Sequence, residues 1–596
     1  MSIPSPFGPT VGTSAAEHLP PAFPERAVRG TAGKLRAWQA EALEAYFLNE
    51  PRDFLVAATP GSGKTTFALR LVTELLARRT IDRITVVAPT EHLKRQWADA
   101  AARVGVRLNP GFKNSDGWHG RQFHGIAVTY AQVATRPALH RSLTEGGRSL
   151  IILDEVHHGG DALSWGDGIR EAFESAARRL SLTGTPFRSD TSPIPFVTYL
   201  EKDGIRTSQP DYSYGYGRAL RDGVVRPVIF LSYAGKMRWR TRTGDEMEAS
   251  LGEGDTKDVT AQAWRTALDP EGQWMPSVLT AADKRLSEVR NSVPDAGGLV
   301  IATDHYAARA YADILQAITG QLPTLVLSDE KSASERIERF SRGERRWMVA
   351  VRMVSEGVDI PRLGVGVYAT SASTPLFFAQ AIGRFVRARR RGETASIFLP
   401  SVPGLTALAG QLELERDHAL DRVVQADGLD DLLVVEANKS DPSGASAYEF
   451  DFKALESSAT FDRVLYDGSE FGTGAEVGSL EELDFIGIPG LLEPDQVREL
   501  LRARQARQAR RVEDRNRRAG AEGQSTPAPA LYRTLKEQRT LLNSLVGIRA
   551  RATGEPHGLI HAELRRIVGG PPVPQASVTQ LQARIDLLRR RMSGGH

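Results

Sequence analysis

The chain has 596 residues, 41% of them hydrophobic and 25% charged, and it carries a formal net charge of +3. That length suggests several domains, and the small net charge excludes nucleic-acid binding through an overall excess of basic residues. Because the chain has no cysteine, disulfides, cysteine-ligated zinc and iron–sulfur clusters are also excluded.

Residues 1–32 combine proline and glycine with few large apolar side chains. They lack the basic start and apolar core of a signal peptide, and they are expected to form a mobile tail. No apolar run approaches the roughly 18 residues that a membrane span needs. A cytoplasmic protein with no membrane partner is therefore expected.

Strand and helix patterns alternate over residues 33–225. Apolar runs bounded by turn residues predict buried strands at 53–58, 84–90, 125–130 and 149–155, with amphipathic helical patterns between them. This alternation is typical of an α/β domain, in which helices cover both faces of a parallel sheet. Residues 33–225 are therefore predicted to form the first domain.

The rest of the chain is predicted to fall into further parts. The pattern weakens over 226–294, which we interpret as a connecting segment, and it resumes over 295–425 as a second α/β domain. Helical patterns then dominate. They predict an accessory, partly helical region over 426–518 that includes a basic helix, a flexible linker over 519–530, and a helical module over 531–596.

The stretch ATPGSGKTT, residues 58–66, joins a predicted strand to a predicted helix. Its glycines let backbone N–H groups approach phosphate oxygens, at a helix N-terminus that favours anions. Lys64 would reach the β- and γ-phosphates, and Thr65 would bind Mg²⁺. The pattern predicts a nucleotide site, with contacts expected from Thr59, Gly61, Ser62, Gly63, Lys64, Thr65 and Thr66.

The stretch LIILDEVHH, residues 150–158, ends a predicted strand in two carboxylates. Charged groups at the end of a buried strand are costly unless they have a function or a partner. Asp154 is expected to hold Mg²⁺ together with Thr65, and Glu155 to orient and deprotonate the attacking water. The two could instead be surface acids, but the phosphate-binding pattern upstream favours the catalytic interpretation.

DEVH, residues 154–157, resembles motif II of the superfamily 2 helicases and translocases. Further stretches between residues 33 and 400 resemble other motifs of that family, in the family's order. Motifs I, II, V and VI are specific, and the others are less so. Motif I is the stretch ATPGSGKTT described above. The further stretches are the adenine-reading segment LRAWQAEAL (35–43), motif Ia VVAPTEHLKRQW (86–97), the following threonine motif VTYAQV (128–133), motif III SLTGTPFR (181–188), motif IV VIATD (300–304), motif V VRMVSEGVDIP (351–361) and motif VI QAIGRFVRAR (380–389).

The resemblance implies two tandem RecA-like parallel-sheet domains followed by a mainly helical C-terminal region, with ATP in the cleft between the domains. It implies that Arg384 and Arg387 stabilise charge on the transferring phosphoryl group. Gln380 would contact the γ-phosphate or the water. The implied nucleoside contacts are Arg36 and Gln39 at the adenine, Asp359 at the ribose and Gly357 through its backbone.

Nucleic acid is implied to cross the opposite rim of both domains. Phosphate contacts are implied for Thr90, Thr129 and Thr303, and for backbone N–H groups near Pro89 and Ser355. Each threonine could instead serve only the turn at the end of its strand.

A basic stripe in the C-terminal third is a further candidate for nucleic-acid binding. Arg504, Arg507 and Arg511 lie three and four residues apart on one face of a predicted helix, and Arg515 and Arg518 continue the stripe. The stripe could bind a phosphate backbone. It could also be an ordinary solvated face.

Two departures from the family pattern narrow the subclass. Motif III has the sequence LTGT at Leu182–Thr185, and motif VI begins with Gln380 rather than with histidine. Both look more like the DNA-directed branch, with its restriction-enzyme motors and its repair or phage branch-migration helicases. We expect an ATP- and Mg²⁺-dependent helicase or translocase, on DNA more than RNA. The alternatives are an RNA helicase, or the motor subunit of a defence, restriction or repair complex whose partner binds the C-terminal helices.

Overall fold

The structure is a computed structural model. It describes residues 35–156, 163–184, 193–202, 205–241, 246–252, 257–327, 333–351, 360–410, 452–472, 474–519 and 557–570, with isolated further positions between 538 and 588. The predicted N-terminal tail and nearly all of the predicted linker lie outside these residues. Within the described ranges, no helix is both long and apolar enough to cross a membrane.

The first domain is built on a parallel sheet of seven strands in the order β3-β4-β2-β5-β6-β1-β9. Apolar residues that alternate along each strand supply both faces: Leu150 and Ile152 of β5 face one core cluster, and Ile151 and Leu153 face the other. The strands are β1 (Asp53–Ala58), β2 (Arg83–Ala88), β3 (Leu108–Asn109), β4 (Gly125–Thr129), β5 (Ser149–Asp154), β6 (Arg178–Thr183) and β9 (Tyr212–Tyr214).

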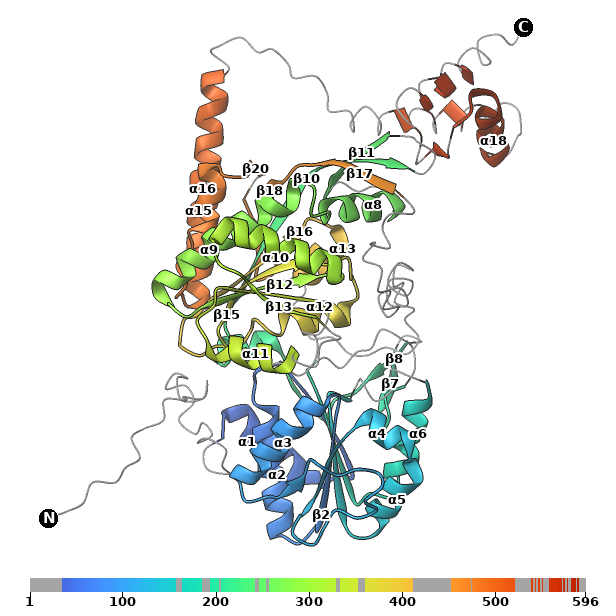
Figure 1. Ribbon diagram of the computed structural model, residues 1–596, viewed down its shortest axis with the longest axis vertical. Coiled ribbons are helices and arrows are strands. Elements are labelled where there is room, and N and C mark those ends of the chain that lie inside the picture. The colour runs from blue at the N-terminus through green and yellow to red at the C-terminus, as the bar shows by residue number, and fades with distance from the viewer. Residues whose placement is uncertain are drawn as a thin grey trace, which may run out of the picture.

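Helices cover both faces of this sheet, as the alternating pattern predicts. Figure 1 shows α1, α2 and α3 on one side and α4, α5 and α6 on the other. The strand pair β7 (Tyr199–Lys202) and β8 (Ile205–Ser208) forms a separate hairpin. The helices are α1 (Ala37–Asn49), α2 (Lys64–Ala77), α3 (Glu91–Arg103), α4 (Tyr130–Thr135), α5 (Pro137–Glu145), α6 (Leu163–Phe173) and α7 (Tyr216–Arg221).

The second domain has a mixed sheet whose main path runs β13-β14-β12-β15-β16-β10-β18-β19. Its strands from β13 to β10 are parallel, and β18 and β19 add antiparallel edges. Its strands are β10 (Val228–Thr241), β11 (Glu246–Leu251), β12 (Gly297–Ala302), β13 (Thr324–Val326), β14 (Trp347–Val351), β15 (Leu363–Ala369), β16 (Ala395–Pro400), β17 (Phe452–Ser457), β18 (Thr460–Tyr466), β19 (Ser469–Phe471) and β20 (Ala475–Glu476).

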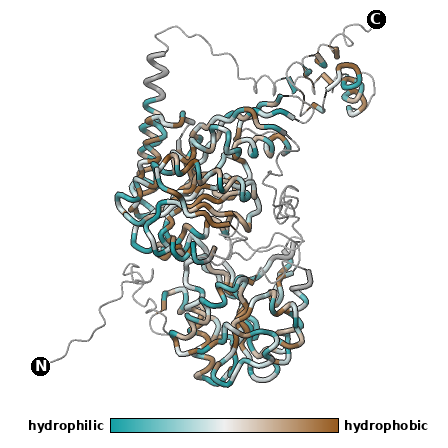
Figure 2. Tube along the Cα trace, viewed as in Figure 1, coloured by the Kyte–Doolittle hydropathy of each residue, from teal (hydrophilic) through white to brown (hydrophobic). Residues whose placement is uncertain are grey.

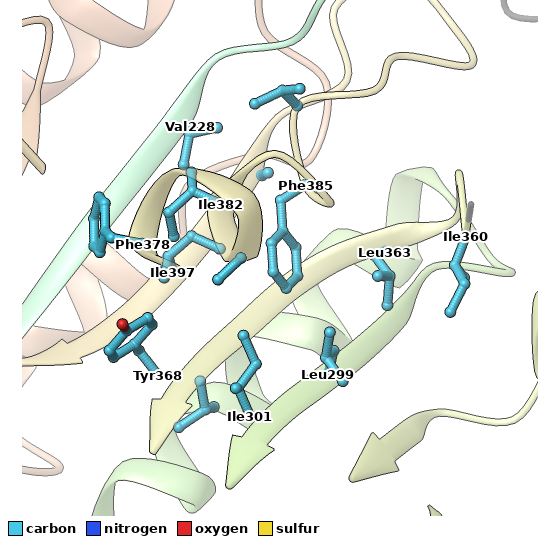
Figure 3. Packing of buried hydrophobic residues seen from close by; sticks show 14 of the residues in the cluster. Val228, Leu299, Ile301, Ile360, Leu363, Tyr368, Phe378, Ile382, Phe385 and Ile397 are labelled. Carbon is cyan, nitrogen blue, oxygen red and sulfur yellow. The ribbon is translucent and has the colours of Figure 1, made fainter. Parts of the chain in front are cut away.

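Hydrophobic residues concentrate along the central strands of this sheet (Figure 2). The core of the second domain also supports the segment of motif VI. Phe378 and Ile382 of α12, and Phe385 just after it, point into a cluster that contains Tyr368 and Ile397 (Figure 3). The helices here are α8 (Lys257–Ala267), α9 (Trp274–Ser292), α10 (His305–Thr319), α11 (Ala333–Arg342), α12 (Pro375–Ile382) and α13 (Pro403–Gly410).

Residues 226–294 are more than the connecting segment that the sequence suggests. They supply β10, which pairs in parallel with β16 and antiparallel with β18, and the helices α8 and α9. Residues 452–476, expected in an accessory region, add β17 to β20 to the same sheet. The apolar run of β10 signals a buried strand, but its partners β16 and β18 in the second-domain sheet lie more than 160 residues away along the chain, so sequence pattern alone does not show which sheet it joins.

The described C-terminal residues are mainly helical. They include α15 (Leu480–Ile486), the long α16 (Pro494–Ala519) and α18 (His557–Val568). Arg285 of α9 is fully buried and donates to Ser396 Oγ at 2.8 Å and to the carbonyl of Ile486 at 3.2 Å, so α15 is fastened to the second domain. Ile560 and Leu564 of α18 belong to a separate small apolar cluster.

Candidate active site

The predicted phosphate-binding loop, called the phosphate loop below, lies between the end of β1 and the start of α2. Gly61 and Gly63 have φ values of +79° and +96°, which L-residues with a Cβ rarely adopt. Lys64 is the first residue of α2, and Thr65 and Thr66 follow in its first turn. Lys64 Nζ donates to the carbonyl of Ala58 at 3.1 Å. The loop therefore has the backbone shape that a phosphate cradle needs.

Three side chains at the start of α1 bind the carbonyl groups of this loop. Arg36 donates to Gly61 at 3.3 Å and also to Ser62. Trp38 Nε1 donates to Ser62 at 3.1 Å, and Gln39 Nε2 donates to Gly63 at 3.0 Å.

Arg36 and Gln39 thus hydrogen-bond to the backbone of the phosphate loop in this structure. Burial lowers the pKa of Arg36 to about 10, and the nearby Arg387 acts in the same direction. Trp38, which the sequence analysis did not single out, stacks on Tyr214 with ring centroids 5.1 Å apart. Arg36 and Gln39 therefore bind the loop and stabilise its shape, a role that the sequence analysis did not predict, and their contact with adenine stays a prediction.

The two predicted carboxylates stand at the end of β5, beside this loop. Glu155 Oε1 lies 3.1 Å from Lys64 Nζ, and Glu155 Oε2 accepts a hydrogen bond from the backbone N–H of Gly184 at 3.0 Å. Glu155 thereby joins the phosphate loop, β5 and the end of β6. Its own φ of +47° is unusual for a residue with a side chain, which is a kind of strain that often marks functional sites.

Asp154 is almost fully buried, and one of its oxygens, Oδ2, accepts a hydrogen bond from Trp97 Nε1 at 2.6 Å. Burial, with Glu155 next to it, raises the pKa of Asp154 to about 6. A buried carboxylate whose charged form is disfavoured in this way would gain from a cation. A carboxylate and a threonine hydroxyl are oxygen ligands suited to Mg²⁺. Asp154 and Thr65 therefore fit the predicted metal site.

The second domain reaches the phosphate loop through motif VI. A Cβ built on Gly61 would stand 2.8 Å from Arg387 Cγ, and one built on Gly383 would stand 2.9 Å from Pro60 Cγ. Burial lowers the pKa of Arg387 to about 10, and the charge of Glu155 partly opposes that shift. Arg387 is thus in contact with the loop and near the proposed base.

The other residues predicted from the second domain divide into two groups. Gln380 lies on α12 and Arg384 in the turn after it, on the same segment as Arg387. Gly357 and Asp359 of motif V lie outside the described residues, as does Ser355. The contacts predicted for these three residues therefore stay predictions.

A buried arginine that the sequence analysis missed fixes the motif VI segment in place. Arg226 lies between α7 of the first domain and β10 of the second. Its backbone N–H donates to the carbonyl of Val386 at 2.8 Å, and its Nε donates to the carbonyl of Phe385 at 2.6 Å.

Arg226 also pairs with Glu393 at 3.3 Å, with both side chains at most 3% exposed. Glu393 in turn accepts from the backbone N–H of Arg389 at 2.9 Å. The backbone of Val225 pairs with that of Arg387 in an isolated antiparallel β-bridge. The connection between the domains and the segment that carries Arg387 are therefore one hydrogen-bonded unit.

The threonines predicted to contact nucleic acid lie at strand ends. Thr90 caps α3 and accepts from Leu93 N at 3.3 Å, and Thr129 caps α4 and accepts from Gln132 N at 3.2 Å. Thr303 is buried, with its hydroxyl 3.5 Å from the carbonyl of Ala369. Pro89 directly precedes the cap of α3. The capping role is therefore visible for Thr90 and Thr129, and phosphate contact stays a prediction.

The arginine stripe of α16 has protein partners that the sequence does not predict. Arg511 pairs with Asp484 at 2.9 Å and Arg507 approaches the same carboxylate at 3.8 Å. Arg504 donates to the carbonyl of Gly487 at 3.0 Å. Arg504, Arg507 and Arg511 lie near buried Leu501 and Gln508 on the helix, and their partners are in or next to α15, but the side chains of Arg507 and Arg511 remain 55% and 39% exposed. The spacing does not reveal these ion-pair partners, and contact between the stripe and nucleic acid stays a prediction.

Comparisons with known proteins agree with this geometry. Residues 32–188 match the family model of the type III restriction enzyme res subunit, and residues 297–389 match the helicase conserved C-terminal domain. These two matches cover the two halves of the site described above. The chain belongs to the superfamily 2 helicases and translocases.

One relative is similar over almost the whole chain. The uncharacterized protein MT2985 of Mycobacterium tuberculosis (strain CDC 1551 / Oshkosh) is 56% identical over 93% of this chain and 92% of its own length. This chain and that mycobacterial protein belong to one family. The DNA 3'-5' translocase XPB2 of Sulfurisphaera tokodaii is 27% identical over 59% of this chain and 79% of its own length.

Among solved structures, a fragment described as the HsdR subunit of a type I restriction enzyme from Vibrio vulnificus YJ016 is similar with a TM-score of 0.44. It is 18% identical and covers 64% of this chain and 67% of the fragment.

Proposed function

We propose that this chain is an ATP-driven motor that hydrolyses ATP between its two domains and acts on DNA. The observation that carries the proposal is that Arg387 of the second domain contacts Gly61 and lies near Glu155, both in the first domain. An arginine brought from one domain to the phosphate loop of another ties hydrolysis to the arrangement of the two domains.

Each side chain of the site has a role in this proposal. The backbone N–H groups of the loop after β1 hold the phosphates, and Lys64 binds the terminal ones. Asp154 and Thr65 would hold Mg²⁺. The cation, when bound, would neutralise phosphate charge. Arg384 and Arg387 stabilise charge that develops on the transferring group, because a guanidinium is always charged and matches phosphate oxygens.

The bond between Lys64 and Glu155 suggests how the base is kept inactive before nucleotide binds. Lys64 Nζ lies 3.1 Å from Glu155 Oε1. When phosphate draws the lysine away, Glu155 loses a positive partner and becomes a better proton acceptor for the attacking water. Glu155 would keep its bond to Gly184 N, which holds the carboxylate in the site.

DNA is proposed as the track on two grounds. The sequence of motif III and the first residue of motif VI resemble the DNA-directed branch of the family. A relative named a DNA 3'-5' translocase matches 59% of this chain. We place the protein in the cytoplasm, because a chain without cysteine suits a reducing compartment.

The test is the steady-state ATPase rate of the purified chain without nucleic acid and with single-stranded DNA, forked duplex DNA or RNA of matched length. We expect DNA to stimulate the rate more than RNA does, and Glu155→Gln to remove turnover under every condition. Stimulation by RNA alone would contradict the DNA proposal. ATP binding without stimulation by any nucleic acid would instead favour a motor subunit that needs a protein partner.

A further inference from the structure

We infer that Trp97 and Tyr130 are positioning residues that hold the metal-binding Asp154 from two helices, and that they link the proposed nucleic-acid edge to the metal site. This inference rests on the proposed function. Neither residue was assigned a role by the sequence analysis or by the comparisons. Both are buried, Trp97 at 2% and Tyr130 at 1% exposure.

The two residues hold different parts of Asp154. Trp97 Nε1 donates to the carboxylate oxygen Oδ2 at 2.6 Å, and the hydroxyl of Tyr130 donates to the backbone carbonyl at 2.9 Å. The first bond fixes the orientation of the side chain, and the second fixes the peptide that follows it. Groups that hydrogen-bond a metal ligand from behind set its direction, and losing one typically costs about 10–100-fold in metal affinity or activity.

The position of each residue on its helix is the second part of the argument. Trp97 lies about two helical turns after Thr90, the cap of α3. Tyr130 directly follows Thr129, the cap of α4. Both caps are candidates for phosphate contact.

The strands below these helices bring the two bonds together. β4, β2 and β5 are neighbours in the sheet, and Ala88 of β2 is opposite Thr129 of β4. Asp154 ends β5, the other neighbour of β2. A nucleic-acid strand that contacts the N-terminal ends of α3 and α4 would therefore act on two helices. One side chain from each helix, Trp97 and Tyr130, hydrogen-bonds to Asp154. Packing inside proteins is tight enough to transmit a small helix displacement.

Simple packing would not require these particular partners. A buried indole N–H or tyrosine hydroxyl needs some acceptor, but here both use the same residue, which is also the metal ligand. The chain contains a matched case without that feature. Trp347 Nε1 donates to Asp283 Oδ1 at 2.8 Å, and the indole is equally buried, but it lies at the start of β14 in the second domain.

The experiment compares Trp97→Phe, Tyr130→Phe and the control Trp347→Phe in the full chain. The first readout is the affinity for a fluorescent ADP with excess Mg²⁺ and with EDTA. We expect the gain in affinity that Mg²⁺ provides to fall about 10-fold or more in Trp97→Phe, with affinity in EDTA unchanged. Trp347→Phe should keep the whole gain.

The second readout is the factor by which DNA stimulates the ATPase. It should fall in both Trp97→Phe and Tyr130→Phe, and it should stay at the wild-type value in the control. Equal behaviour of Trp97→Phe and Trp347→Phe in both readouts would overturn the inference. If Trp97→Phe does not fold, Tyr130→Phe decides, because it removes one oxygen only, and an unchanged stimulation factor in it would overturn the inference.

The outcome also separates this inference from the proposed function. A wild-type chain that binds ADP with a Mg²⁺-dependent gain but has no ATPase activity would contradict the proposed function. The ADP comparison between Trp97→Phe and Trp347→Phe would still test the positioning role. An active wild-type chain with unaffected variants would contradict the inference alone.

Discussion

Arg387 of the second domain lies directly over Gly61 in the phosphate loop of the first. A Cβ at residue 61 would stand 2.8 Å from Arg387 Cγ, well inside ordinary van der Waals contact. Residue 61 also has a φ of +79°, where glycine is favoured. The missing side chain therefore allows both the backbone shape of the loop and the close approach of the other domain.

Gly61→Ala is expected to disturb both features at once. The methyl group would push Arg387 away and strain the loop, so ATP turnover should fall by at least about 10²-fold, the loss that a misplacement of about 1 Å can cause. The measurement is the steady-state ATPase rate. Gly105→Ala is the matched control, because its φ is +82° but nothing lies within 4 Å of the added Cβ. Equal turnover in the two variants would contradict the importance of the contact.

Glu155→Gln is expected to retain nucleotide binding and lose turnover by about 10²–10⁴-fold, the usual contribution of a general base. The amide can still accept from Gly184 N, but it cannot take a proton from water. The control Glu74→Gln changes an i,i+4 pair with Arg70 on the surface of α2 and should leave the rate unchanged. Normal turnover by Glu155→Gln would remove Glu155 from the role of base.

Glu393→Gln should destabilise the second domain and displace the segment that carries Arg387. It leaves the buried guanidinium of Arg226 without its charged partner, which typically costs about 3–5 kcal/mol. Urea unfolding measures the decrease in the free energy of unfolding. ATP turnover should also fall, while nucleotide affinity should stay at the wild-type value. Glu338→Gln is the control, because its pair with Arg342 is exposed and should contribute less than about 1 kcal/mol. Equal free energies of unfolding for the two variants would show that the buried pair stabilises the domain no more than the exposed pair does.

The double variant Arg507→Ala/Arg511→Ala tests whether the stripe of α16 contacts nucleic acid. Because both side chains approach Asp484, we expect DNA affinity and its dependence on salt to stay at wild-type values. Each lost phosphate contact would lower the slope of log affinity against log salt by about 0.9. A fall of nearly two in that slope would restore the phosphate-contact interpretation.

Sequence patterns predict the local parts of this fold well. The buried strands of the first domain, the loop before Lys64 and the pair Asp154 and Glu155 can all be read from residues close together in the chain. These features depend on local periodicity and on the turn that glycine allows. The family resemblance adds the arrangement in two domains, which the structure confirms as two separate sheets joined at residues 225–227.

Features that depend on distant pairing could not be predicted in the same way. Trp97 is one apolar residue of an amphipathic helix until the fold brings it to Asp154, 57 residues later. Arg226 and Glu393 are 167 residues apart, and neither belongs to a motif. The stripe of α16 is a similar case, because a regular spacing of charges does not reveal that Asp484 and the carbonyl of Gly487 will bind its arginines.

The most direct test of the shared site is Arg387→Ala, measured by ATP binding and by single-turnover hydrolysis with saturating DNA. Its matched control is Arg390→Ala, an exposed arginine on the same segment. We predict ATP affinity close to that of the wild type and hydrolysis slower by about 10³-fold or more, as for arginine fingers, with the control unaffected. An unchanged rate in Arg387→Ala would contradict the claim that the second domain completes the ATP site.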